Sequence, residues 1–349
     1  MPSTETEEPP ESEPTEEHSG LGAWLIDAAV RTFLAVGVLP ILLLGLVIFF
    51  GIIEPRFLSG DNVFNVSRQL TYLGIITMGQ AVVLMSGGFD LSVGGTVALT
   101  SVVAATIMSG QIDGGSSLAT ALTLGILGGL AVGLVVGIAN GFAVAILKVT
   151  PFVVTLAMSS ITYGLALMVA DGAPVSGVPI EFARKLGTGK LWGVPAPVWV
   201  ALVLLVVMTV LMGRTRFGRY VYAIGGNEKA ARLSGISVWR TTALVYVICS
   251  VLAAIAGIML TARVSSGEPN LGGSFPLESI AAAVLGGVAL GGGQGRLLGA
   301  VGGAAFVVML QNGMNLIRVE NYVQQIVIGI ALITAVVVDR LRDVVRART

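Results

Sequence analysis

The chain has 349 residues, of which 54% are hydrophobic and 11% are charged, and its mean hydropathy is +0.89. A soluble domain carries about 25% charged residues, so this composition excludes a water-soluble globule and predicts an all-α polytopic membrane protein. The 20 basic and 20 acidic residues give a formal net charge of +0, which leaves no charge-based argument for nucleic acid as a partner. The 47 glycines are nearly twice the usual fraction of about 7%, which suits close helix packing in lipid.

The first 20 residues form an acidic segment that contains no Lys or Arg. Seven glutamates and four prolines leave too little apolar surface here to offset the entropy lost on ordering. We expect residues 1–20 to be a disordered cytoplasmic tail in which His18 is a solvated side chain, and we assign the tail no role. No basic stretch, apolar stretch and small-residue cleavage site open the chain in that order, so we expect the first apolar run to remain as a span.

About ten apolar runs follow the tail, and each is a candidate transmembrane helix because a bilayer core about 30 Å thick needs about 20 apolar residues per helix. The run at residues 117–147 is long enough to be tilted or broken. We expect residues 21–349 to form a single transmembrane domain with both termini on one side. The runs lie near residues 28–53, 69–87, 93–109, 117–147, 152–170, 194–213, 241–262, 277–291, 297–315 and 322–338.

The basic residues predict the orientation. With the amino terminus in the cytoplasm, 13 of the 20 Lys and Arg residues fall in inside segments, as the positive-inside rule requires. Both termini are then cytoplasmic, in a multi-pass protein of the cell inner membrane. The seven basic residues outside are Arg56, Arg68, Arg184, Lys185, Lys190, Arg263 and Arg318.

The apolar runs carry no arrangement of side chains typical of catalysis or metal binding. The single cysteine, Cys249, lies in an apolar run, and the only histidine lies in the tail. The apolar runs hold no closely spaced carboxylate pair, and the chain lacks the G-x-x-x-x-G-K-[ST] phosphate loop. We therefore predict that the chain is not an enzyme, that it holds no catalytic residue, metal or cofactor, and that any ATP is hydrolysed by a partner.

Residues 87–95, with the sequence G-G-F-D-L-S-V-G-G, interrupt a long apolar stretch. The glycines permit an unwound turn, and Asp90 or Ser92 is placed to cap the helix that restarts after it. An acid at membrane depth costs roughly 2.5 to 3.5 kcal/mol on insertion scales, so it should face protein or water. Two roles are open: a cap and hinge, or direct contact with a polar solute in the translocation path.

Three amides within apolar runs are further candidates for the substrate path, namely Gln80, Asn140 and Asn312. Each has donors and acceptors for a passing hydroxyl group. The alternative is that such an amide joins neighbouring helices, a contact worth about 0.6 kcal/mol on average.

The loop at residues 214–240 leaves the bilayer with six basic residues. Asn227 is a good N-cap, and Gly235 is placed to stop the short helix that follows. A helix this short is unstable alone, so either the membrane interface or a groove on a cytoplasmic partner must hold it. The residues of this candidate coupling helix are Asn227, Glu228, Ala230, Ala231, Arg232 and Gly235.

Several segments together resemble the permeases of ribose-type ABC importers for monosaccharides, in the branched-chain amino acid and sugar permease family. Residues 87–95 resemble the signature G-I-D-L-S-V-G, and residues 218–236 are similar to that family's E-A-A-x-x-x-G coupling loop, with Glu228 displaced by one position. Phe89 stands where Ile is usual, and residues 292–294 are less basic than in the family. The matching segments are residues 87–95, 151–156, 218–236, 278–287, 292–295 and 312–316.

The resemblance implies an ABC importer permease fold with two related halves, and a homodimer of permease chains around a central path. It also implies a cytoplasmic ATP-binding subunit, which binds the ATP and Mg²⁺, and an extracytoplasmic sugar-binding protein. The function implied is import of a monosaccharide such as ribose or xylose by alternating access. We keep open a permease of the same architecture for nucleosides or branched-chain amino acids, an ion-coupled carrier, and a membrane enzyme or channel.

A short pattern, G-G-x-x-L-x-x-G, occurs at residues 87–94 and again at residues 286–293. In a chain this rich in glycine, coincidence and duplication explain the pattern about equally well. It agrees with two related halves, which many transporters have.

Overall fold

A computed structural model gives the structure of the chain and describes residues 39–346. The expected acidic tail and the first part of the run at residues 28–53 lie outside the described residues. The described chain is mostly helical, with one two-stranded hairpin. Its elements are α2 (Leu39–Ile53), η1 (Pro55–Leu58), α3 (Gly60–Met85), α4 (Val93–Asp113), α5 (Leu118–Ala145), α6 (Pro151–Val169), α7 (Ile180–Phe182), η2 (Ala183–Gly187), β1 (Lys190–Leu191), β2 (Val194–Pro195), α8 (Ala196–Arg214), α9 (Arg216–Gly226), α10 (Glu228–Leu233), α11 (Val238–Val264), α12 (Phe275–Leu285), α13 (Leu297–Leu316) and α14 (Asn321–Arg346).

Each apolar run corresponds to a helix, but not every helix is long and apolar enough to cross a membrane. Within residues 39–346, six helices meet both requirements: α4, α5, α6, α8, α11 and α13. The helices α3 and α14 are long but carry more polar residues. The helix α12 has 11 residues, about 17 Å in length, which is too short for a bilayer core of about 30 Å. The expected count of about ten spans is therefore not exact.

The run at residues 117–147 forms one continuous helix, α5, which packs along α11. Glycines on α5 face the α11 backbone directly. A Cβ atom added to Gly137 would lie 2.6 Å from Val247 Cα, and one added to Gly141 would lie 2.9 Å from Ala243 Cα. Close packing of these two helices thus depends on the absence of side chains, as the glycine content predicts.

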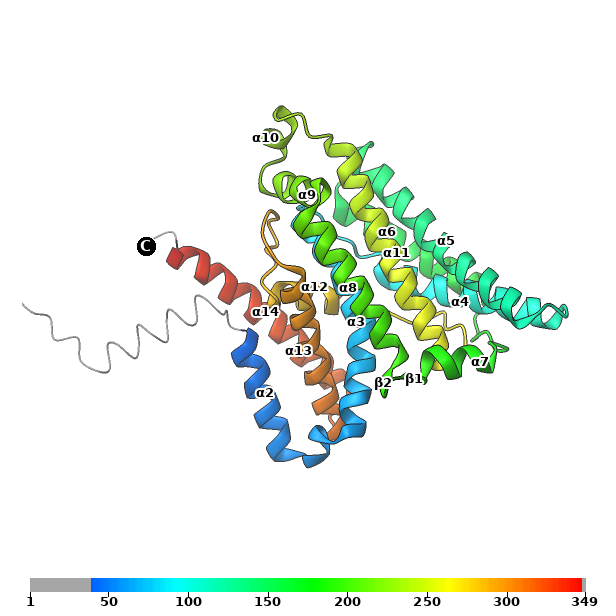
Figure 1. Cartoon of the computed structure of the whole chain (residues 1–349). Coiled ribbons are helices and arrows are strands. Elements are labelled where there is room, and N and C mark those ends of the chain that lie inside the picture. The colour runs from blue at the N-terminus through cyan, green and yellow to red at the C-terminus, as the bar shows by residue number, and fades with distance from the viewer. Residues whose placement is uncertain (1–38, 347–349) are drawn as a thin grey trace, which may run out of the picture.

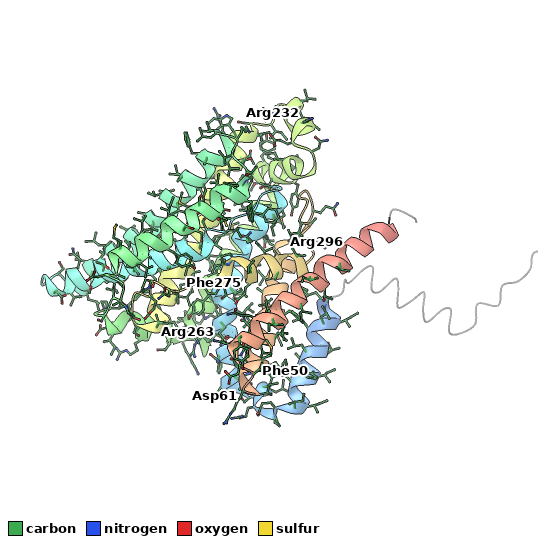
Figure 2. The ribbon with its side chains drawn as sticks, turned by 180° about the vertical axis from the view of Figure 1, so that it is seen from behind. Phe50, Asp61, Arg232, Arg263, Phe275 and Arg296 are labelled. Atoms are coloured by element: carbon green, nitrogen blue, oxygen red, sulfur yellow. The ribbon has the colours of Figure 1, made fainter. Side chains whose placement is uncertain are left out.

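The connecting segments gather at two ends of the bundle. In Figure 1, α9 and α10 lie at one end, and α7, β1 and β2 lie at the other. Lys148 Nζ lies 3.9 Å from Glu228 Oε1, which brings the α5–α6 loop to the α10 end. Figure 2 shows Arg232 at this end and Arg263 and Asp61 toward the opposite end. This separation agrees with the sequence prediction, which places Lys148 and Arg232 on the cytoplasmic side and Arg263 on the outer side.

Two interruptions of the helices meet inside the bundle. The first interruption, residues 86–92, separates α3 from α4. The second lies around α12, which has irregular segments on both sides, at residues 265–274 and 286–296. A Cβ atom on Gly95 would overlap Thr162 Oγ1, which lies roughly halfway along α6, so α4 begins within the bundle. A Cβ atom on Gly94 would lie 3.1 Å from Pro276 Cδ in the first turn of α12. The first turns of α4 and α12 are therefore in contact.

The two interruptions begin with the same helix cap. At the end of α3 and at the end of α12, an amide N–H bonds at 3.0 Å to the carbonyl five residues earlier. Gly87 and Gly287 both have φ +83°, the left-handed conformation that such a cap requires. The repeated sequence pattern aligns Gly87 with Gly286. In the structure, Gly87 is equivalent to Gly287, one residue later than the pattern places it. The cap geometry, rather than the number of adjacent glycines, determines which glycine occupies this position.

Candidate functional site

Three of the predicted path residues, Asp90, Ser92 and Asn140, form one hydrogen-bonded group, which we call the Asp90 cluster. Asp90 Oδ1 accepts hydrogen bonds from the Ser92 N–H at 2.8 Å and from the Ser92 hydroxyl at 2.6 Å. Ser92 Oγ in turn accepts a hydrogen bond from Asn140 Nδ2 at 2.8 Å. None of the three side chains is exposed to solvent in the single chain. The cluster therefore links the start of α4 to the last two turns of α5.

The sequence places the cluster because a helix must restart here. The helix α4 begins at Val93, as predicted, and its first N–H groups have no partner within the helix. Ser92 occupies the N-cap position, but its side chain makes no cap bond to α4. Asp90 Oδ1 instead accepts the N–H of Ser92, the residue before α4, so Asp90 holds the turn and does not pair with the free N–H groups of the helix. The Tyr246 hydroxyl donates to the Phe89 carbonyl at 3.3 Å and so holds the turn from α11.

Two oxygen atoms of the Asp90 cluster are buried and have no hydrogen-bond partner among the described residues. They are Asp90 Oδ2 and Asn140 Oδ1. A buried acceptor left unpaired costs about 1–3 kcal/mol. Both atoms are acceptors, so a hydroxyl group that reached them would be able to donate a hydrogen bond and remove that cost.

The other two predicted path residues do not join this cluster. Gln80 is fully buried on α3, and neither of its amide atoms has a partner within residues 39–346. Asn312 on α13 and Asn62 on α3 exchange amide hydrogen bonds of 2.8 and 2.9 Å. Asn62 lies near the start of α3 and the Asp90 cluster beyond its end, with most of this helix of about 39 Å between them. Asn312 therefore joins two helices far from Asp90.

The short helix predicted in this loop is present as α10, and its coupling role stays a prediction. Asn227 Oδ1 accepts a hydrogen bond from the Ala230 N–H at 3.0 Å, which makes Asn227 the N-cap. Gly235 has φ +78° and ends the helix. Glu228 Oε1 accepts a hydrogen bond of 2.7 Å from Arg232 Nη2, one turn further along. Both side chains are more than half exposed, so this pair adds little stability.

The loop contains a second helix, α9, which the sequence analysis missed. Thr215 is its N-cap, with its hydroxyl oxygen accepting from the Gly218 N–H at 3.5 Å, and Asn227 is both the C-cap of α9 and the N-cap of α10. A Thr three residues before a glycine is a weak signal for a helix cap. The apolar periodicity of the segment, however, indicates an amphipathic helix. The Tyr222 hydroxyl donates to the Gly295 carbonyl at 2.9 Å, which ties α9 to the segment before α13.

The surface around α10 is exposed and partly apolar. Leu233 is 90% exposed and Ala230 is exposed, whereas Ala231 is buried against the chain itself. A groove of about 470 Å³ lies beside α10, between the α5–α6 loop and the start of α11. Lys148 and Trp239 are among its lining residues. The chain thus presents both a projecting helix and a concave surface at this end.

The comparisons with known proteins assign the chain to a family. It belongs to the family described as "Branched-chain amino acid transport system / permease component", which matches residues 62–336. The chain is therefore a transport component rather than an enzyme, and with six long apolar helices in its described part it is a multi-pass membrane protein. The resemblance drawn from the sequence motifs is confirmed at the level of this family.

Three similar relatives are permeases named for sugars. "Ribose import permease protein RbsC" of Bacillus subtilis is 40% identical over 85% of this chain and 90% of the relative. "L-arabinose transport system permease protein AraH" of Escherichia coli is 37% identical over 84% of this chain and 86% of the relative. "D-allose transport system permease protein AlsC" of Escherichia coli is 34% identical over 85% and 89%. No solved structure matches the chain.

Proposed function

We propose that this chain is the permease subunit of an ATP-driven ABC importer that moves a monosaccharide across the cell inner membrane by alternating access. Its similarity to permeases named for ribose, arabinose and allose, over more than four fifths of the chain, is the observation that carries the proposal. These names do not favour nucleosides or branched-chain amino acids as substrates. An ion-coupled carrier would need ionisable relay groups in the spans, and among the predicted path residues only Asp90 is ionisable.

The coupling part of the proposal concerns α10. We propose that a cytoplasmic ATPase subunit, which binds ATP and Mg²⁺, holds the helix formed by Glu228–Leu233. Three observations support this role: the helix projects from the bundle (Figure 1), it is too short to be stable alone, and a groove lies beside it. The exposed Leu233 is the apolar contact that such a partner would cover.

For the path, we propose that the Asp90 cluster meets the sugar when the bundle opens. The two unpaired acceptors, Asp90 Oδ2 and Asn140 Oδ1, suit a sugar hydroxyl as donor. A neutral substrate needs no buried charge, and weak polar contacts allow it to leave. Gln80 stays a predicted path residue on the same grounds. For Asn312, the reciprocal bond to Asn62 supports the alternative role of joining helices.

At the other end of the bundle, we propose docking of an extracytoplasmic sugar-binding protein. Arg68 and Arg263 lie on α3 and α11 there, and among the side chains that the structure describes no carboxylate lies within ion-pair distance of either. Arg263 Nη2 donates to Asn65 Oδ1 at 3.3 Å, and Lys190 Nζ lies 4.3 Å from the centre of the Phe64 ring. Guanidinium groups without acidic partners suit an acidic face of the binding protein, in a charged interface of modest strength.

We further propose a homodimer of single-domain permease chains with both termini in the cytoplasm. The orientation rests on the distribution of basic residues and is testable with single cysteines in a Cys249→Ser background. A membrane-impermeant maleimide added to intact cells should label Trp192→Cys in the β1–β2 turn and should not label Lys229→Cys in α10. The reverse labelling would overturn the orientation. Cross-linking of the purified complex measures the number of permease chains.

The substrate class is tested by reconstitution. Vesicles that contain the permease, its ATPase subunit and its sugar-binding protein should take up radiolabelled ribose or arabinose when ATP is supplied on the ATPase side. Leucine and a nucleoside such as adenosine serve as competing probes in the same vesicles. Uptake of leucine or adenosine in preference to both sugars would contradict the proposal.

A further inference from the structure

Three segments that are far apart in the sequence meet at one point in the described bundle. They are residues 85–87 at the end of α3, residues 225–226 at the end of α9, and residues 292–293 between α12 and α13. Apart from Met85 and Ser86, every residue in these segments is glycine. We call this contact the glycine junction.

The backbones approach so closely that no side chain fits between them. A Cβ atom on Gly225 would overlap Met85 O and lie 2.5 Å from Gly293 N. A Cβ atom on Gly292 would lie 2.9 Å from both Gly87 Cα and Gly225 O. Backbone atoms cannot rotate aside as the end of a flexible side chain can, so a methyl group added at Gly225 or at Gly292 would force whole segments apart.

Hydrogen bonds fix the three segments to one another. Gly293 N–H donates to Met85 O at 2.9 Å, which joins the α12–α13 segment to the end of α3. The Tyr222 hydroxyl donates to Gly295 O at 2.9 Å, which joins α9 to the same segment. A displacement of α9 therefore acts on α3 and on the α12–α13 segment at once.

The junction is connected to α10 by a single residue. Asn227 ends α9 and begins α10, and its side chain caps α10. The N–H of Asn227 bonds to Ala223 O at 3.0 Å, so the same residue is held by α9. The two helices thus share a rigid corner, one residue away from Gly226.

On its other side, the junction touches both interruptions of the bundle. Gly87 begins the turn that contains Asp90, and Gly292 lies in the irregular segment that follows α12. Only residues 88 and 89 separate Gly87 from Asp90. The loop that carries α10 therefore contacts, by backbone alone, the segment that leads into the Asp90 cluster.

We propose that the glycine junction transmits displacement of α10 to the two helix interruptions, and that Gly225 and Gly293 are positioning residues for transport. The inference rests on the proposed function, because α10 must be moved by an ATPase subunit. It adds the route inside the chain: α10, Asn227, the end of α9, and then the turn before α4 together with the segment before α13. Rigid backbone contact suits this transmission because no side chain can absorb a small shift by changing its rotamer.

The experiment compares Gly225→Ala with Gly226→Ala, two identical substitutions one residue apart. A Cβ atom on Gly225 overlaps Met85 O, whereas a Cβ atom on Gly226 meets nothing within 4 Å. Each variant is purified with its ATPase subunit and placed in vesicles with the sugar-binding protein. Sugar taken up per ATP hydrolysed is measured with radiolabelled ribose. A purely structural loss lowers the amount of complex but leaves this ratio unchanged.

We expect Gly225→Ala to keep its ATPase subunit and to hydrolyse ATP, while sugar moved per ATP falls about tenfold, a value within the range for mutations between coupled sites. Gly226→Ala should match the wild type. Tyr222→Phe, which adds no volume and removes the bond to Gly295, should lower the ratio about twofold to fivefold, and it serves as the test if Gly225→Ala does not fold.

The inference is overturned if Gly225→Ala keeps the wild-type ratio, if Gly226→Ala loses as much, or if Tyr222→Phe leaves the ratio unchanged. Release of the ATPase subunit by a folded, membrane-inserted Gly225→Ala variant would also overturn it, because the junction would then shape the docking surface instead of transmitting its motion. Absence of ATP-dependent uptake in the wild-type vesicles would instead refute the proposed function itself.

Discussion

Asn140 on α5 donates a 2.8 Å hydrogen bond to Ser92 Oγ, at the start of α4, across 48 positions of sequence. The same hydroxyl donates to Asp90, so one serine joins an amide to a carboxylate in a site closed to solvent. This relationship brings together three residues that the sequence had marked separately. It also makes their contributions interdependent, because removal of any one leaves the others with an unpaired group.

Substitutions at Asp90 separate its two possible roles. Asp90→Asn retains an oxygen acceptor for the Ser92 N–H and hydroxyl, so we expect the variant to fold and assemble but to lose about tenfold in sugar uptake if Asp90 meets the substrate. Asp90→Ala removes the acceptor and should also lower the free energy of unfolding by about 1–3 kcal/mol. Thermal unfolding in detergent and uptake in vesicles are the two measurements. Wild-type uptake by Asp90→Asn would leave the residue only the role of holding the turn before α4.

The Asn62–Asn312 pair should contribute to stability and not to transport. We expect Asn62→Ala and Asn312→Ala each to lower the free energy of unfolding, and the double variant to cost less than the sum because the first substitution already breaks the pair. The coupling energy should be about 0.6 kcal/mol, the average for hydrogen bonds between membrane helices. A fall in uptake per folded complex for Asn312→Ala, with stability unchanged, would contradict this expectation and indicate that Asn312 contacts the substrate.

The cap of α10 should control attachment of the ATPase subunit. Asn227→Ala removes the acceptor for the Ala230 N–H and costs about 1 kcal/mol of helix stability, so less ATPase should co-purify with the permease. Asn227→Asp is the matched control, because Asp caps a helix as well as Asn does. Equal recovery of ATPase with both variants would show that a folded α10 is not needed for attachment.

Glycines on the α5–α11 contact should be intolerant of even one methyl group. Gly137→Ala places a Cβ atom 2.6 Å from Val247 Cα, so we expect a lower unfolding temperature. Gly164→Ala on α6 is the control, since its Cβ atom meets nothing within 4 Å and alanine favours a helix by about 1 kcal/mol over glycine. A Gly137 variant as stable as the Gly164 variant would contradict the close packing of α5 on α11.

The sequence predicted most helices and the cap at Asn227, because apolar runs and cap residues are local signals. It did not predict that α12 would have only 11 residues, since its apolar run continues into residues that the contacts with α13 hold in a turn. The α9 helix was missed although its apolar periodicity indicates an amphipathic helix, because its cap, Thr215, is a weak signal.

The site was predictable by residue type but not by partner. Asp90, Ser92 and Asn140 were marked because polar groups in apolar runs are costly, yet no pattern links position 92 to position 140. Asn312 was marked by the same reasoning. Its partner, Asn62, lies 250 positions away, before the predicted apolar run at residues 69–87. Contacts between distant segments are set by helix packing, which periodicity does not encode.

The central claim is that this chain moves sugar only when a separate ATPase subunit drives it. The most direct measurement compares radiolabelled ribose uptake by vesicles that contain the permease alone, under a proton or sodium gradient, with vesicles that also contain the ATPase subunit, ATP and the sugar-binding protein. We predict uptake only in the second preparation. Uptake by the permease alone, driven by an ion gradient, would contradict the claim.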